Sequence, residues 1–97
     1  MPTYVGLYNF TEQGFRNIKE TVKRMELAKK AAAQIGETIK EVVWLQGQYD
    51  LMILYEATDE VAANAFLLNN LKAGNIRGQT LRAFTAPEME KILERVT

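Results

Sequence analysis

Residues 41–55 read Glu41-Val42-Val43-Trp44-Leu45-Gln46-Gly47-Gln48-Tyr49-Asp50-Leu51-Met52-Ile53-Leu54-Tyr55. Two runs rich in valine, isoleucine, tryptophan and tyrosine flank Gly47, which is the pattern of a β-hairpin. The turn also carries polar and aromatic side chains that could hold a ligand: Trp44, Gln46, Gln48, Tyr49 and Asp50. This stretch therefore predicts two neighbouring strands and a first candidate site.

A strand and a helix precede the hairpin. Residues 3–9 alternate with apolar side chains on both faces, which predicts a strand covered on both sides. Thr11 is a credible N-cap, and apolar residues then recur at steps of three or four from Phe15 to Ile35. This spacing predicts a long helix that bends near Glu20-Thr21 and ends at Gly36. The basic residues off this stripe predict a solvated helix face: Lys19, Lys23, Arg24, Lys29 and Lys30.

A helix, a strand and a short final helix follow the hairpin. Thr58 or Asp59 is expected to begin a helix that runs to about Lys72. The side of this helix that approaches the sheet is expected to carry Ala62, Ala65, Phe66 and Asn69. Residues 76–84 predict the fourth strand. Thr85-Ala86-Pro87-Glu88 has the form of a capping box, which predicts a final helix that packs on its own subunit or reaches a neighbour.

The predicted order is β-α-β-β-α-β plus a terminal helix, which is the split βαβ or ferredoxin-like arrangement. The fold class is α+β, with a four-stranded antiparallel sheet and two helices on one face, and residues 1–97 form a single domain. The uncovered face would present, depending on register, Tyr4, Tyr8, Trp44 or Leu45, Met52 or Leu54, and Thr80 or Arg82. Because an exposed apolar face usually marks an interface or a ligand groove, we expect a two-fold dimer with its sheets face to face.

The composition argues against several functional classes. Lysine plus arginine number 12 and aspartate plus glutamate number 12, so the basic surplus of a nucleic-acid binder is missing. The third strand also lacks the basic residues of an RNA-recognition domain. Because the chain has no histidine and no cysteine, we expect no metal, no cofactor and no catalysis by those side chains. No membrane span or signal peptide is evident, so we expect a cytoplasmic protein without a membrane partner.

Three segments resemble the GYD-domain family, and they occur in the right order. They are Met1–Gly14, Trp44–Asp50 with the Gly-x-Tyr-Asp motif, and the fourth-strand residues Gly74–Arg77 and Thr80–Phe84. The resemblance spans nearly the whole chain. It implies a ferredoxin-like fold of the dimeric α/β-barrel kind, and it implies no particular reaction. Gly78 stands where a larger or polar residue is expected, so no side-chain role is assigned there.

Each candidate site residue has a structural interpretation beside the functional one. Gly47 and Asp50 could only shape the turn, or Asp50 could accept a proton or anchor a polar ligand beside Tyr49. Arg82, and less so Arg77, could neutralise an acidic ligand, or could pair with Asp50 or Glu56. The aromatic side chains could line a pocket or form a dimer core. The ligand-binding candidates are Tyr4, Tyr8, Trp44, Gln48, Tyr49, Asp50 and Arg82.

The leading hypothesis is a homo-oligomer that binds a small molecule, or regulates through such binding, in a cleft near the Gly47–Asp50 turn. One alternative, by analogy of fold, is a cofactor-independent enzyme of the monooxygenase or isomerase kind. Asp50 would then be the base, and Tyr49 or Arg82 would stabilise developing negative charge. The other alternative is an assembly module that binds no ligand.

Overall fold

The computed structural model describes all residues from Met1 to Thr97. Its elements follow the predicted order, with the first helix divided into three parts: β1 (Thr3–Phe10), α1 (Glu12–Arg16), the 3-10 turn η1 (Ile18–Glu20), α2 (Thr21–Gln34), β2 (Thr38–Trp44), β3 (Leu51–Glu56), α3 (Glu60–Lys72), β4 (Ile76–Ala83) and α4 (Ala86–Leu93). The four strands form one antiparallel sheet in the order β2-β3-β1-β4. The predicted α+β, ferredoxin-like fold is therefore confirmed.

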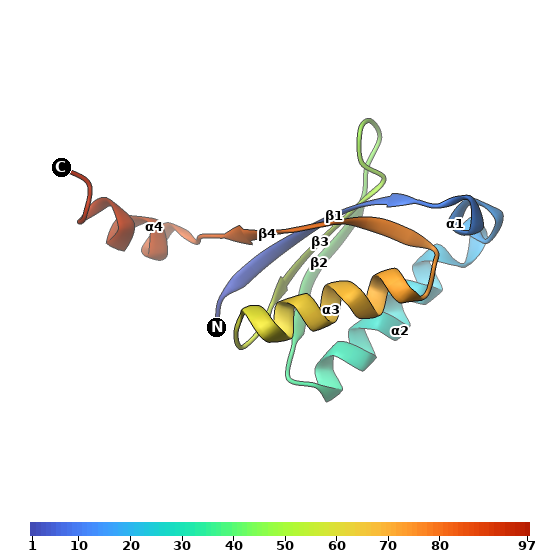
Figure 1. The fold of residues 1–97 in the computed structure, drawn as a ribbon, viewed down its shortest axis with the longest axis horizontal. Coiled ribbons are helices and arrows are strands. Elements are labelled where there is room, and N and C mark those ends of the chain that lie inside the picture. The colour runs from blue at the N-terminus through green and yellow to red at the C-terminus, as the bar shows by residue number, and fades with distance from the viewer.

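The hairpin between β2 and β3 forms as predicted around a glycine. Gly47 has a φ of 125°, a backbone conformation that favours glycine. The Leu45 N–H donates to the Asp50 carbonyl at 2.8 Å and closes the base of the loop. In Figure 1 this loop rises from the sheet on the side away from α2 and α3.

The predicted helix starts are also confirmed. The Thr11 side chain accepts from the Gly14 N–H, and the Asp59 side chain accepts from the Ala62 N–H at 2.9 Å. Thr85 and Glu88 form the reciprocal capping box of α4. The rings of Phe10 and Phe15 pack edge to face across the first cap, with centroids 5.5 Å apart. The expected bend near Glu20-Thr21 is the 3-10 turn that separates α1 from α2.

α2 and α3 cover one face of the sheet (Figure 1). Large side chains from the sheet fill the core beneath these helices. Tyr8, Leu51, Ile53 and Tyr55 are fully buried there. The Tyr55 ring lies 4.3 Å from the Phe66 ring, centroid to centroid, and its hydroxyl donates to the Ala63 carbonyl at 3.3 Å. Half of the helix residues in or against the core are alanines, and the aromatic rings fit beneath these small side chains.

The aromatic residues that we placed on the uncovered face lie on the helix side instead. Tyr4 pairs with Tyr55, and both Tyr8 and Trp44 pair with Leu51, so the register puts these side chains beneath the helices. The same register puts Thr80 and Arg82 on the helix side. On α3 the buried residues are Ala63 and Phe66, whereas Ala65 and Asn69 are exposed. The prediction for that helix was therefore correct for Phe66 and for Ala62, which packs against the core, and wrong for Ala65 and Asn69.

The uncovered face of the sheet carries aliphatic side chains. The residues that the register places there include Val5, Leu7, Val43, Met52, Leu54 and Leu81. They form adjoining rows across all four strands, and Leu81 is 43% exposed. With no element packed over them, these rows form a continuous apolar surface on the sheet.

The C-terminal helix projects away from the rest of the chain. α4 extends from the end of β4, away from α2 and α3 (Figure 1), and it exposes Met89, Ile92 and Leu93. The radius of gyration is 14.5 Å, against about 12.5 Å for a compact chain of this length. α4 therefore does not pack on its own subunit. No helix combines the length and apolarity needed to cross a membrane.

Two glycines let β1 lie close to its surroundings. A Cβ at Gly6 would meet the Tyr8 ring, which folds back along the strand over Gly6. A Cβ at Gly78 would overlap the Leu7 carbonyl oxygen and crowd the Tyr8 Cα on the neighbouring strand. The expectation of a larger residue at position 78 therefore conflicts with the packing of β4 against β1.

Replacing Gly78 with alanine is expected to lower the free energy of unfolding by about 3 kcal/mol or more, because the new methyl group meets backbone that cannot move aside. Urea unfolding followed by circular dichroism measures this change. The neighbouring Gln79→Ala variant removes one exposed hydrogen bond and should cost about 1 kcal/mol or less. Equal stabilities for the two variants would contradict the close approach.

Burial of Tyr8 predicts an alkaline instability. Burial, with a smaller contribution from Tyr55, raises the pKa of Tyr8 from 10.0 to about 12, although Asn70 and Thr80 oppose the shift. The unfolded chain therefore loses this proton first as the pH rises. The free energy of unfolding should fall between pH about 10 and about 12, by up to about 3 kcal/mol. Tyr8→Phe should make this fall shallower in urea titrations across that range, whereas Ile53→Val, another core substitution, should leave the slope unchanged. Equal slopes for all three proteins would contradict it.

Candidate functional site

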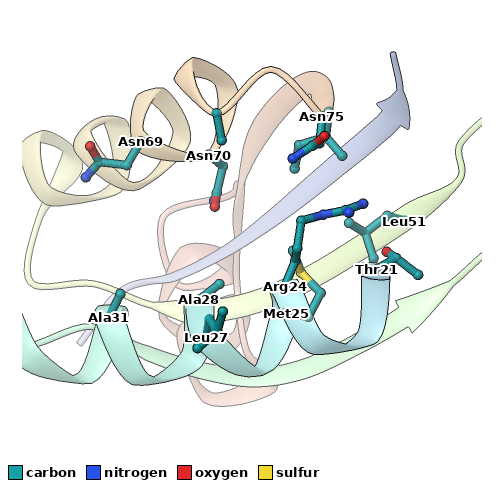
Figure 2. A pocket seen from close by; sticks show the side chains of 12 residues that line it. Thr21, Arg24, Met25, Leu27, Ala28, Ala31, Leu51, Asn69, Asn70 and Asn75 are labelled. Atoms are coloured by element: carbon teal, nitrogen blue, oxygen red, sulfur yellow. The ribbon is translucent and has the colours of Figure 1, made fainter. Parts of the chain in front are cut away.

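A cavity of about 320 Å³ lies between α2 and α3, above the start of β3 (Figure 2). Most of its wall is apolar and is formed by Met25, Leu27, Ala28, Ala31, Leu51, Ala73 and Ile76. A second hollow of about 340 Å³ adjoins it and shares Ala28, Ala31, Asn69 and Asn70. The groove between the two helices is thus longer than the cavity alone, because the small alanine side chains do not close it.

The polar part of the cavity wall comes from the start of α2, the end of α3 and the loop before β4. Its members are Thr21, Arg24, Asn69, Asn70 and Asn75. The Arg24 side chain leaves α2 toward Asn75 and Leu51, and Asn70 points from α3 toward α2 (Figure 2). The Trp44 indole N–H donates to the Thr21 hydroxyl at 3.0 Å, which ties the end of β2 to the cavity rim.

Several polar atoms in and behind this cavity are buried without a hydrogen-bond partner. They are the Tyr8 hydroxyl, Arg24 Nη2 and Asn70 Nδ2. The Tyr8 hydroxyl lies behind the wall, near Asn70 and Thr80. The other guanidinium nitrogen of Arg24, Nη1, donates to the Asn17 carbonyl at 2.8 Å. Buried polar groups are nearly always paired, so these atoms require hydrogen-bond partners, which ordered water or a ligand can supply.

Sequence analysis missed Arg24 and Asn70. It assigned Arg24 to a solvated helix face, which is wrong because one end of the guanidinium is buried at the cavity. A signal was present, since Thr21, Arg24, Ala28 and Ala31 follow one another at steps of three and four. On α3, the same spacing places Asn70 after Ala63 and Phe66, on the buried stripe.

Asp50 joins the start of β3 to the end of β1. Its Oδ2 accepts from the Phe10 N–H at 3.0 Å and from the Asn9 side chain at 3.4 Å. Its own N–H donates to the Tyr8 carbonyl at 2.9 Å. The Asn9 side chain also donates to the Gln48 carbonyl at 2.8 Å. These bonds give Asp50 and Gln48 a structural task at the hairpin, and neither residue lines a cavity.

Tyr49 turns toward the uncovered face of the sheet. Its hydroxyl accepts from the Gln79 side chain at 2.9 Å. Gln79 pairs with Leu7, and both residues belong to the rows on the uncovered face. Tyr49 is therefore separated by the sheet from the cavity between the helices.

Arg82 and Tyr4 lie at a third place, where β4 leads into α4. The Arg82 guanidinium lies 5.6 Å from the centroid of the Tyr4 ring and 4.6 Å from that of Phe84. It pairs with Glu88 at 3.1 Å, not with Asp50 or Glu56 as we had considered. A hydrogen bond from the Thr85 backbone, assisted by Arg82, lowers the pKa of Glu88 to about 2. A smaller hollow of about 270 Å³ adjoins Tyr4, Thr80 and Arg82.

The seven candidate residues therefore do not converge on one site. Gln48, Tyr49 and Asp50 belong to the hairpin, and Tyr4 and Arg82 to the junction with α4. Only Trp44 and Tyr8 adjoin the cavity between α2 and α3, Trp44 at its rim and Tyr8 behind it.

Comparisons with known proteins give one match. A search of curated proteins found none that matches, and a search of solved structures found none either. The family model described as GYD domain matches residues 4–93, which is nearly the whole chain. The matched region includes every strand, the hairpin with Gly47, Tyr49 and Asp50, and both helices that form the cavity. The chain therefore belongs to the GYD-domain family.

Proposed function

We propose that this protein is a homo-oligomer that binds a small molecule in the cavity between α2 and α3. The observation that carries the proposal is the group of buried, unpaired polar atoms at an otherwise apolar cavity. The proposed site replaces the cleft that we expected at the Gly47–Asp50 turn, because no residue of that turn lines a cavity.

The energetics of the cavity support occupation by a ligand. Each buried polar group without a partner costs about 1–3 kcal/mol, and a ligand that pairs with such groups recovers part of this cost. The apolar wall supplies contact area that favours an organic molecule over water alone. A volume of about 320 Å³ lies at the lower end of the range for small-molecule sites. Catalysis with Asp50 as the base has no comparable support, since its carboxylate holds the hairpin.

A thermal-shift screen of small metabolites tests the binding proposal. A ligand present at about 100 times its dissociation constant should raise the melting temperature by several degrees, because it stabilises only the folded state. Ala31→Phe, which fills the cavity from an exposed position, should abolish this rise. Ala33→Phe makes the same change on the same helix outside the cavity and should retain it. An equal rise in both variants would place the ligand elsewhere.

The uncovered sheet face supports the homo-oligomer. The accessible surface is 6620 Å², whereas a compact chain of 11.0 kDa exposes about 5600 Å². The excess of about 1000 Å², to which the projecting α4 also contributes, is comparable to the roughly 800 Å² that one partner contributes to a stable interface. The aliphatic rows cross the middle of the sheet, so two copies related by a two-fold axis can cover each other's rows. A second copy of this chain is the occupant that we propose.

Sedimentation velocity at micromolar concentration tests this assembly. The unmodified protein should sediment as a dimer or a larger oligomer. Leu54→Glu places a charge in the aliphatic rows and should yield monomer without loss of helical circular dichroism. Leu68→Glu, which alters an exposed leucine on the outer side of α3, should leave the oligomer intact. A monomeric unmodified protein would remove this part of the proposal.

A further inference from the structure

The cavity between α2 and α3 has one charged group in its wall. Arg24 supplies it, and the remaining lining residues are apolar or carry neutral hydroxyl and amide groups. No aspartate or glutamate lines the cavity, so no protein carboxylate in the wall compensates the guanidinium charge. The electrostatic potential inside the cavity therefore favours a negatively charged occupant.

The guanidinium of Arg24 is anchored at one end and unpaired at the other. Nη1 donates to the Asn17 carbonyl at 2.8 Å, which restricts the orientation of the group. Nη2 is buried and has no partner. Because the guanidinium is already held at one end, binding an acceptor at the other end costs little further side-chain conformational entropy.

Asn70 lies across the same cavity, on α3 (Figure 2). Its carbonyl oxygen points toward α2, whereas its unpaired Nδ2 lies near the Tyr8 hydroxyl behind the wall. The unpaired group at the cavity is therefore Arg24 Nη2, which is a donor, so the matching group on a ligand is an acceptor. An oxyanion satisfies both requirements, because it accepts hydrogen bonds and compensates the charge of Arg24.

The rest of the cavity determines the body of the ligand. Met25, Ala28, Leu51 and Ile76 form an apolar wall next to the guanidinium. A single arginine matches a single negative charge, and the apolar wall offers no further cation for a dianion. We propose that the ligand of this cavity is a small monocarboxylic acid with a compact apolar body, whose carboxylate pairs with Arg24 Nη2. This inference rests on the proposed function and specifies its ligand class.

Protein-observed NMR titration with matched fragments tests the ligand class. The probes are benzoate and hexanoate, each compared with its neutral amide. Both acids should bind with about tenfold to a hundredfold lower dissociation constants than their amides, which is the difference expected for a charge-assisted hydrogen bond. Arg24→Met keeps the length of the side chain and should remove this preference while amide binding persists. Lys23→Met removes the same charge from the neighbouring exposed position outside the cavity and should leave the preference intact.

The outcomes separate this inference from the function on which it rests. Amides that bind in the cavity as tightly as the acids would overturn the carboxylate assignment and leave a small-molecule site standing. A preference that survives Arg24→Met, or that Lys23→Met removes, would also overturn it. Both proposals fall if two results occur together. Neither the acids nor the amides bind in the NMR titration, and Ala31→Phe leaves every melting-temperature rise in the metabolite screen unchanged.

Discussion

The packing of large sheet side chains against smaller helix side chains determines most of this structure. The sheet contributes Tyr4, Tyr8 and Tyr55 to the core, and half of the facing helix residues are alanine. Small helix residues leave room for the large rings of the sheet, so the helices and the sheet pack closely where the rings are present. Where the alanines of α2 face the end of α3, no ring fills the space, and the cavity remains.

The same packing explains what the sequence could and could not predict. Local signals located the hairpin, the three helix caps and the bend near Glu20, because turns and caps depend on residues close together in the chain. The facing of the strands depends on contacts between distant residues. In β1 both alternating sets are apolar, so a period of two cannot say which set meets the helices. The rings were therefore assigned to the wrong side.

The site was harder to predict than the fold for a related reason. Arg24 is a common surface residue on an amphipathic helix, and only the position of α3 reveals that one end of its guanidinium is buried. Asp50 was predicted as a site residue because it stands in a polar turn. Its carboxylate instead accepts hydrogen bonds from Phe10 and Asn9, some 40 residues earlier. A carboxylate that binds backbone and one that binds a ligand look alike until the partner strand is known.

The two faces of the sheet have separate tasks in the proposals made above. The helix side holds the cavity, and the opposite side holds the aliphatic rows, with Tyr49 above them. Small changes on α2 and α3 can therefore alter the ligand without disturbing the surface through which copies would associate. The β1 backbone, which Asp50 and Gly78 hold in place, is common to both sides.

The position of the Gly-x-Tyr-Asp motif has a consequence for how relatives are compared. Its aspartate secures the hairpin to β1, and its tyrosine lies on the side of the sheet away from the cavity. The motif residues therefore report how the sheet is built. Because they do not line the cavity, they give no information on ligand preference. Two proteins that share the motif in full could have diverged in what they bind. The positions to compare for that purpose are those corresponding to Arg24, Ala31 and Asn70.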